Sequence, residues 1–250
     1  MRAAVAFVLT SVFVAVACSS PVPAPMAGDV TVFAGSSLTD AFRKAGDEMT
    51  KANPDARFTF NFGSSSTLAT QIINGAPADV FASADEANML KIVDAALTDG
   101  APTAFAGNRL EIAVAAGNPK RIATLADLAR PDVVLVLAAP TVPAGKYALE
   151  ALTKAGVSAK PVSQEVDVRA VLNKVSLGEA DAGVVYVTDV KSAAGRVTGV
   201  DIPEPQQVLA RYPIAVVKDS KNAALAHRFV DYLLSPAGQS VLAEFGFSKP

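Results

Sequence analysis

From residue 29 onwards, runs of β-branched and aromatic residues alternate with segments whose apolar residues recur at helical spacing. The runs predict strands at 30–34, 57–62, 79–82, 110–115, 133–138, 183–187 and 211–217. The helical segments lie at 38–52, 67–73, 83–95, 124–129, 144–155, 167–177, 221–234 and 237–245, and the third opens with the capping-box pattern Ser83-Ala84-Asp85-Glu86. This alternation is typical of parallel sheets with helices on both faces, so an α/β fold is expected.

The second half of the chain predicts a division into two lobes. The strand at 211–217 carries Pro213, which favours a sheet edge or a crossing between sheets over a sheet centre. The linker Pro203-Glu204-Pro205 precedes this strand, and a matching crossing is expected near Gly107-Asn108. We therefore expect residues 29–107 and 209–250 to form lobe 1, and residues 108–208 to form lobe 2.

The N-terminal segment has the pattern of a secretory signal. A basic start precedes the apolar run 3–17, which at 15 residues is short of the about 20 that a membrane span needs. Cys18 follows, and Ser, Pro, Ala and Gly dominate residues 19–28. We expect residues 1–18 to be a lipoprotein-type signal ending at a lipidated Cys18, and 19–28 to be a flexible tether. The alternative is an ordinary cleaved signal.

Composition narrows the function further. The chain has 22 Lys and Arg against 24 Asp and Glu, no Trp and no basic cluster, which argues against a nucleic-acid surface. Its single cysteine excludes an internal disulfide framework and a site built from several cysteines.

The candidate chemistry lies at four turns that lead into predicted helices. The first two are rich in serine: Gly35-Ser36-Ser37 with Ser37 as the expected N-cap and Asp40 three residues on, and Gly63-Ser64-Ser65-Ser66. Pro143 and Asp167 open the other two. Helix N-termini present unpaired N–H groups and a positive dipole end, so several together would bind an oxyanion without Lys or Arg. The alternative is that these serines only cap helices.

These turns carry a family resemblance. The segments VFAGSSLTDAF (32–42), FGSSSTLATQI (62–72), GAPADVFASAD (75–85), VPAGKYALEAL (142–152), GVVYVTD (183–189) and YLLSPAGQSVLAEFGF (232–247) occur in order. Together they resemble the periplasmic molybdate-binding proteins of ABC-type uptake systems, over essentially the whole chain after residue 29. The resemblance implies a two-lobed type II periplasmic-binding fold, with mainly parallel sheets. It also implies a monomer outside the cytoplasmic membrane that captures molybdate between its lobes, without a cofactor, and delivers it to the permease.

The resemblance also implies which residues contact the anion. Ser37 and Ser65 correspond to the family's two binding serines, and Tyr186 to its tyrosine hydroxyl donor. Ala144 and Val168 correspond to positions that bind through backbone N–H groups. The chain departs from the family at Gly35-Ser36, where two alanines are common, so Ser36 adds a hydroxyl.

The expected ligand follows from what such donors accept. Molybdate is fully deprotonated at neutral pH, and tungstate matches it in charge and nearly in size. Phosphate keeps a proton that a pocket of donors would leave unpaired, at a cost of about 1–3 kcal/mol. Sulfate carries no proton, so a sulfate-binding protein remains the alternative.

Other classes of function find less support. A serine hydrolase would need His227, the only histidine, whose predicted helix lies away from the serine turns. Cation binders of related fold use tyrosine pairs, histidine and acids, and the tyrosines here are not adjacent in sequence. Arg169 is expected to form a structural ion pair, and Lys146 to lie at the surface.

Overall fold

The computed structural model describes residues 27–250 and has the expected α/β architecture. The expected signal at residues 1–18, including lipidation of Cys18, and most of the expected tether lie outside the described residues. The strands are β1 (Gly28–Gly35), β2 (Ala56–Gly63), β3 (Val80–Ala82), β4 (Thr98–Ala115), β5 (Leu135–Ala138), β6 (Ser163–Glu165), β7 (Ala182–Tyr186), β8 (Val197–Asp201) and β9 (Leu209–Val217). The α-helices are α1 (Thr39–Ala52), α2 (Ser65–Ile73), α3 (Glu86–Asp94), α4 (Pro143–Lys154), α5 (Val168–Ser176), α6 (Val187–Ser192), α7 (Ala223–Leu234) and α8 (Pro236–Glu244). Short 3-10 helices cover Ser36–Leu38, Leu125–Ala129 and Glu204–Gln206.

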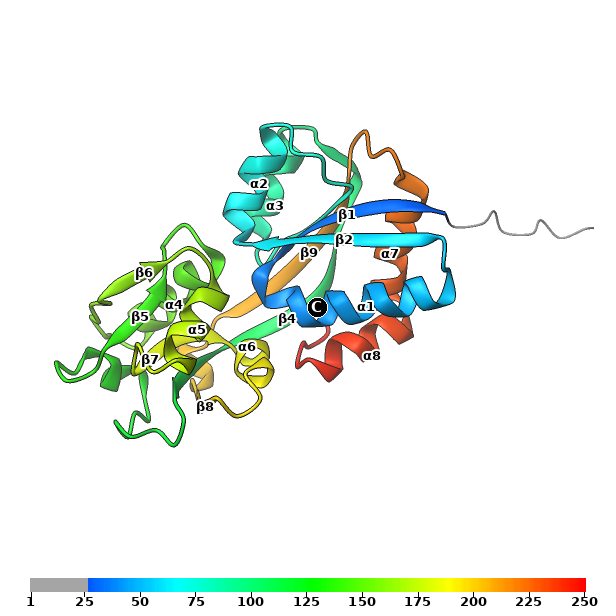
Figure 1. Cartoon of the computed structure of the whole chain (residues 1–250). Helices are drawn as coiled ribbons and strands as arrows, with labels where there is room; N and C mark the ends of the chain where they lie inside the picture. Colours follow the sequence, from blue (N-terminus) through cyan, green and yellow to red (C-terminus); the bar gives the residue numbers. More distant parts are fainter. Residues whose placement is uncertain (1–26) are drawn as a thin grey trace, which may run out of the picture.

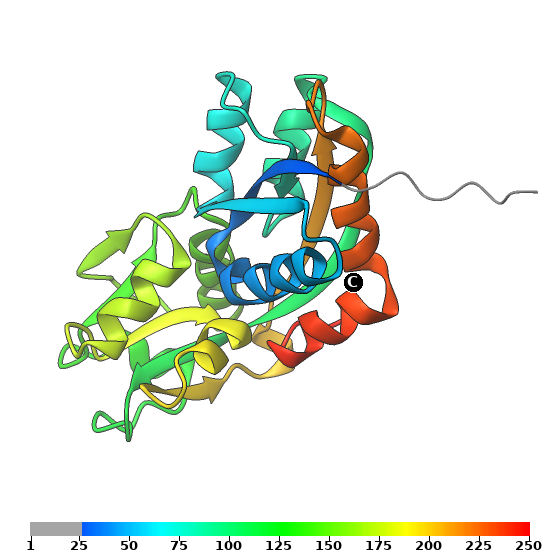
Figure 2. The same ribbon diagram turned by 45° about the vertical axis from the view of Figure 1, so that its right-hand side comes forward.

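The molecule has two lobes joined by long strands (Figure 1). One lobe holds β1 to β3 with α1, α2, α3, α7 and α8, and the other holds β5 to β8 with α4, α5 and α6. The strands follow the order β2-β1-β3-β9-β4-β7-β5-β6, with β8 paired to β4. Figure 2 shows β4 and β9 running from one lobe into the other.

The sheets combine parallel and antiparallel pairs. β1 pairs in parallel with β2 and β3, and β5 with β6 and β7, as the alternating pattern predicts. The joining strand β4 is antiparallel to β9, β7 and β8, and β9 is antiparallel to β3. Each lobe therefore combines parallel pairs with antiparallel pairs that involve β4 or β9, and these two long strands also connect the lobes.

The expectation of a sheet edge for Pro213 is wrong. β9 lies between β3 and β4 in the sheet, so it has a neighbour on each side. Proline lacks the N–H that a regular ladder needs. The pairing of β9 with β4 shifts register on both sides of the Ala104–Pro213 pair, which accommodates the missing donor. The alternative of a crossing strand agrees with the path of β9 between the lobes.

Both faces of β1 are buried over residues 32–34, and successive residues of this strand pack against different helices. Val32 and Ala34 of β1 belong to the core cluster that includes Phe42 of α1 and Phe229 of α7. Phe33 belongs to a second cluster with Leu68 of α2 and other residues of α2 and α3. Because successive side chains point to opposite faces, the strand reads as a continuous apolar run.

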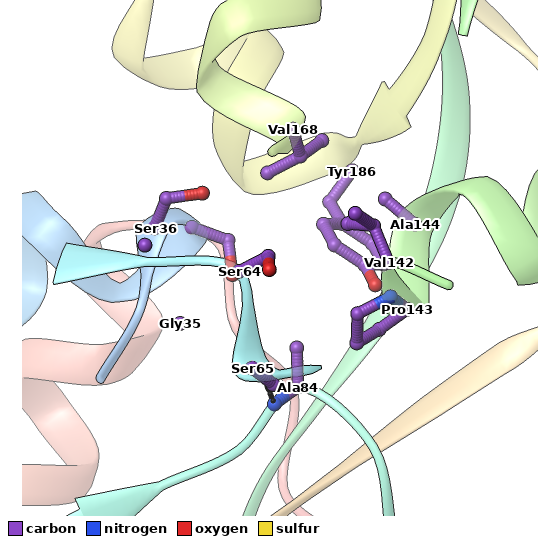
Figure 3. A pocket seen from close by; sticks show the side chains of 12 residues that line it. Gly35, Ser36, Ser64, Ser65, Ala84, Val142, Pro143, Ala144, Val168 and Tyr186 are labelled. Carbon is purple, nitrogen blue, oxygen red and sulfur yellow. Dashed lines mark hydrogen bonds between the residues drawn. The ribbon is translucent and has the colours of Figure 1, made fainter. Parts of the chain in front are cut away.

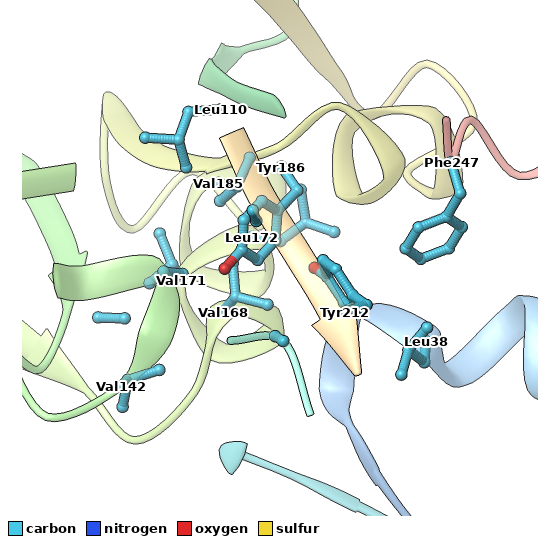
Figure 4. Close-up of a cluster of buried hydrophobic side chains, with 14 of the residues drawn as sticks. Leu38, Leu110, Val142, Val168, Val171, Leu172, Val185, Tyr186, Tyr212 and Phe247 are labelled. Carbon is cyan, nitrogen blue, oxygen red and sulfur yellow. The ribbon is translucent and has the colours of Figure 1, made fainter. Parts of the chain in front are cut away.

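The first cluster continues across the junction between the lobes. Figure 4 shows Leu38 and Phe247 from one lobe close to Tyr212 of β9, with Val168 and Tyr186 of the other lobe beside them. These residues are buried. The junction is therefore packed, and the turns before α1, α2, α4 and α5 face one another across it (Figure 3).

Candidate functional site

One small cavity between the lobes brings all five predicted contact residues together (Figure 3). Its lining comes from the four turns named above, together with Ala84 after β3 and Tyr186 at the end of β7: Gly35, Ser36, Ser37, Gly63, Ser64, Ser65, Ala84, Val142, Pro143, Ala144, Val168 and Tyr186. The cavity volume is about 10 Å³. Pockets for drug-sized ligands span roughly 300–1,000 Å³, so this cavity is far too small for such a ligand.

The first turn differs locally from the prediction. Ser36–Leu38 forms a 3-10 turn, and α1 begins after Leu38 without a side-chain cap, so the expectation that Ser37 is an N-cap is wrong. The Ser37 hydroxyl instead lies 3.0 Å from the hydroxyl of Tyr212. Asp40 does not close a capping box either, because its carboxylate accepts from Arg169 at 2.7 Å. Ser37 is thereby available to the cavity.

The second turn separates a capping serine from a cavity serine. Ser64 is the N-cap of α2, and its hydroxyl accepts from the Thr67 N–H at 3.2 Å. Ser65 is the first residue of α2, and its hydroxyl oxygen accepts from the Ala84 N–H at 2.9 Å. That bond leaves the hydroxyl proton of Ser65 to donate, and its backbone N–H has no acceptor within the helix.

A neighbouring cap also differs from the prediction. The pattern at 83–86 suggested Ser83 as the cap of the next helix, but Asp85 caps α3 by accepting from the Asn88 N–H at 3.0 Å. Ser83 donates to the carboxylate of Asp85 at 3.2 Å. The helix therefore starts at Glu86, and the Ala84 N–H is left to hold Ser65.

The opposite wall consists of two helix starts. Val142 is the N-cap of α4 and Pro143 its first residue, which leaves the N–H of Ala144 at an unpaired position. Glycine at position 145 allows the first turn of α4 to pack closely against the backbone at the end of β5, since a Cβ there would lie 2.2–2.3 Å from the carbonyl oxygens of Ala139 and Ala138. Val168 is the first residue of α5, and the cap Asp167 accepts from Ala170 rather than from Val168.

Tyr186 contributes a hydroxyl that has no hydrogen-bond partner in the part of the chain that the structure describes. Within residues 27–250, its oxygen is the only fully buried side-chain polar atom without a hydrogen bond. Burial raises the pKa of Tyr186 well above its usual range, so the group stays a neutral donor. Buried polar groups almost always find partners, so an orphaned hydroxyl in a cavity points to a bound group.

The cavity is electrostatically positive without a cationic side chain. Its lining residues carry no ionisable group besides the Tyr186 phenol. The starts of α2, α4 and α5 direct partial positive charge and free N–H groups at it. No cluster of three or more His, Cys, Asp or Glu residues able to hold a metal ion exists in the described part of the chain. The arrangement can bind an oxyanion through hydrogen bonds.

The charged residues weighed in the sequence lie outside the cavity. Arg169 donates to Asp40 at 2.7 Å and to Asp189 at 2.8 Å, which is the structural ion pair expected. Lys146 is exposed, as expected. His227 lies on α7 within 2.9 Å of Asp99 and is not part of the lining.

Two residues near the site escaped the sequence analysis. Tyr212 and Asn108 lie behind Ser37, on β9 and β4, and Asn108 donates to the Tyr212 hydroxyl at 3.3 Å. The Tyr186 and Tyr212 rings pack edge to face with centroids 6.0 Å apart, although 26 positions separate them along the chain. No local sequence pattern predicts this pair of tyrosines, because it forms only where β9 crosses between the lobes.

Comparison with known proteins agrees with this architecture. Residues 30–248 match the family described as bacterial extracellular solute-binding protein. The molybdate-binding protein ModA of Mycobacterium tuberculosis is 45% identical over 242 residues, which cover 94% of this chain and 93% of that protein. Across residues 27–250, no helix combines the length and the apolar character that crossing a membrane requires.

Solved structures share the fold. The periplasmic molybdate-binding protein of Azotobacter vinelandii superposes with a TM-score of 0.80 at 21% identity, covering 88% of this chain and 99% of that one. The sulfate-binding protein SubI of Mycobacterium tuberculosis gives 0.78 at 20% identity, covering 88% and 86%. These two likenesses concern the fold alone. The profile match and the 45% relative show that the chain belongs to the bacterial extracellular solute-binding proteins, in the company of the ModA proteins.

Proposed function

We propose that the chain is an extracytoplasmic binding protein that captures molybdate between its lobes for uptake. The observation that carries this proposal is the small cavity lined by hydrogen-bond donors, into which the unpartnered Tyr186 hydroxyl projects. The 45% identity to a protein named as molybdate-binding supports the choice of anion.

The proposed contacts use hydroxyl and N–H groups only. Ser37 and Ser65 donate their hydroxyl protons from one lobe, and Tyr186 donates its own from the other. Ala144 and Val168 donate through their N–H groups at the starts of α4 and α5. Each donor meets a negatively charged acceptor, which makes such bonds stronger than those between neutral groups.

The hydrogen-bond donors that line the cavity distinguish anions without a proton from anions that carry one. Molybdate and tungstate bring only acceptor oxygens, which donors can satisfy fully. The lining contains no carboxylate to accept a proton from hydrogen phosphate. Sulfate stays the second candidate on chemical grounds, because it too carries no proton, and size must then exclude it.

We further propose that binding closes the lobes and that the permease receives the closed form. A ligand drives closure only if it binds the closed form better, and donors on both lobes meet that condition. We propose that the lobe boundaries lie at 107/108 within β4 and at 208/209 at the start of β9. Attachment through a lipid on Cys18 and a monomeric state belong to the same proposal.

Calorimetric titration of the purified protein with molybdate, tungstate, sulfate and phosphate tests the function. We expect one-to-one binding of molybdate and tungstate, with sulfate and phosphate far weaker. Preference for sulfate would keep the site but change the nutrient. If none of the four anions binds, the proposal of an oxyanion-binding protein is wrong.

A further inference from the structure

A buried hydrogen-bond chain lies directly behind the cavity. The Ser37 hydroxyl is 3.0 Å from the Tyr212 hydroxyl, and the Asn108 amide nitrogen donates to Tyr212 at 3.3 Å and to Thr188 at 2.9 Å. All four residues are buried. Asn108 and Tyr212 sit on β4 and β9, the two strands that join the lobes, so the chain lies where the lobes meet.

The orientation of the Asn108 amide is fixed by its own neighbour. The backbone N–H of Arg109, which can only donate, lies 3.0 Å from Oδ1 of Asn108. That contact identifies Oδ1 as the acceptor, so Nδ2 is the atom that faces Tyr212. Tyr212 therefore accepts a hydrogen bond from Asn108.

The hydrogen-bond geometry then favours one acceptor for the proton of Tyr212. Burial raises the pKa of Tyr212 far above its usual range, so the phenol keeps its proton. Two oxygens lie near this hydroxyl: Ser37 Oγ at 3.0 Å, and the hydroxyl of Tyr186, which makes no regular hydrogen bond within residues 27–250. If Ser37 donated instead, the Tyr212 proton would be left with only the poorly placed Tyr186 oxygen, which is unfavourable. Tyr212 therefore donates to Ser37, and the Ser37 proton is free to point into the cavity.

The hydroxyls of Ser65 and Tyr186 are also arranged as donors. The Ala84 N–H occupies the oxygen of Ser65, which leaves the Ser65 proton to donate. Tyr186 is protonated and has no partner within the described residues. The three hydroxyls of the proposed contact set are thus all arranged as donors towards the ligand.

We propose that Tyr212, oriented by Asn108, is a positioning residue that fixes the Ser37 hydroxyl as a donor and thereby restricts the site to oxyanions without a proton. The inference rests on the proposed function and explains its selectivity. An oxyanion that carries a proton needs an acceptor, and the Tyr212 bond occupies a lone pair of Ser37 that would otherwise serve. Loss of that bond frees Ser37 both to turn and to accept.

The decisive variant is Tyr212→Phe, which keeps the ring and removes the hydroxyl. Three probes are compared by displacement of bound molybdate at neutral pH: molybdate itself, selenate and arsenate. Selenate and arsenate are close in size, but only arsenate keeps a proton at this pH. We expect molybdate and selenate to weaken in parallel by about threefold to tenfold, and arsenate to improve relative to molybdate by at least about tenfold.

Two further variants separate positioning from general damage. Asn108→Leu removes the donor that orients Tyr212, so it should shift the arsenate-to-molybdate ratio in the same direction by a smaller factor. Thr188→Val is the matched control, because it removes the other acceptor of the Asn108 amide and leaves in place the Arg109 N–H contact that orients the amide and the bonds from Asn108 to Tyr212 and from Tyr212 to Ser37. Its ratio should equal that of the wild type.

The outcomes are distinct. An arsenate-to-molybdate ratio in Tyr212→Phe that stays at the wild-type value, or arsenate binding that remains undetectable, overturns the positioning role. If Tyr212→Phe does not fold, the ratio measured for Asn108→Leu decides in the same way. Absence of molybdate binding by the wild type would instead overturn the proposed function.

Discussion

At the residue scale, the most informative group is a single hydroxyl. Tyr186 is buried, protonated and without a partner in the described chain, so it destabilises the empty protein and is satisfied only by a ligand. The hydroxyl therefore lowers the stability of the ligand-free protein and strengthens the binding of the ligand.

Tyr186→Phe tests that pair of effects. Molybdate binding should weaken by about 1.5–3 kcal/mol, because a hydrogen bond to a charged group is lost. The melting temperature of the ligand-free protein should stay equal or rise, because the unsatisfied hydroxyl is gone. Calorimetry and thermal unfolding give the two values. Tyr147→Phe on α4, outside the cavity lining, is the control, and equal affinities in both variants would refute the role of Tyr186.

Single residues were predictable where the motif itself carries the chemistry. Ser37, Ser65, Ala144, Val168 and Tyr186 could be named from their segments, and the structure gathers all five in one cavity. Tyr212 and Asn108 could not be named, because their importance comes from pairings between residues that are distant along the chain. Their roles as ligands or positioning residues remain predictions.

At the element scale, the serine-rich turn before α2 divides two tasks between adjacent residues. Ser64 caps the helix, whereas Ser65 faces the cavity and is held by the Ala84 N–H. The sequence alone left the choice between cap and ligand open, because Ser suits both tasks. The hydrogen bonds identify Ser64 as the N-cap of α2 and show that Ser65 does not cap the helix.

Adjacent alanine substitutions separate these tasks. Ser65→Ala should weaken molybdate binding by about 1–3 kcal/mol, as should Ser37→Ala, because each loses a donor to a charged acceptor. Ser64→Ala should lower the free energy of unfolding by about 1 kcal/mol through loss of the cap, with a smaller effect on affinity. Titration and urea unfolding of the three variants provide the comparison. A larger loss of affinity in Ser64→Ala than in Ser65→Ala would reverse the assignment.

A second element-scale prediction concerns the β4–β8 pair. Glu111 lies directly opposite Asp201, and burial followed by the Asp201 charge raises the pKa of Glu111 from 4.5 to about 7. The folded state therefore holds this proton more tightly than the unfolded state, and the associated stability is lost as pH rises through about 7.

Glu111→Gln should remove that pH dependence. At pH 8 the variant should exceed the wild type in free energy of unfolding by about 1–2 kcal/mol, a value reduced for the partial exposure of Glu111. Near pH 5 the two proteins should be about equal, because the wild-type carboxyl is then protonated when folded. Urea unfolding at both pH values measures the difference, and a gap independent of pH would contradict the assigned pKa.

The elements themselves were predictable to the extent that their apolar pattern was strong. The strands β1 and β2 and the helices α4, α5, α7 and α8 lie close to their expected ranges. The short elements β6, α6 and β8 were missed, because three to six residues with polar neighbours carry too little periodicity.

At the scale of the whole molecule, one ion pair links the lobes beside the cavity. Arg169 follows the proposed contact residue Val168 on α5 and binds Asp40 on α1 of the other lobe at 2.7 Å. It also binds the fully buried Asp189 within its own lobe at 2.8 Å. The contact with Asp40 can form only when the two lobes are close, so it should favour the closed arrangement that we propose for the bound protein.

Asp40→Asn should therefore weaken molybdate binding although Asp40 does not line the cavity. We expect a loss of about 0.2–1 kcal/mol, which is typical of a partly exposed pair, and a smaller loss at high salt. Glu244→Gln is the control, because Glu244 pairs with Lys44 inside one lobe. Titrations at two salt concentrations measure both variants, and equal affinities for Asp40→Asn and the wild type would show that the pair does not assist closure.

The most direct test of the account is the position of the metal atom in a crystal of the protein grown with molybdate. Anomalous scattering from molybdenum locates that atom without reference to any assumed contact. We expect one strong peak in the cavity between the lobes, with oxygens in reach of Ser37, Ser65, Ala144, Val168 and Tyr186. An empty cavity, or a peak elsewhere on the molecule, would contradict it.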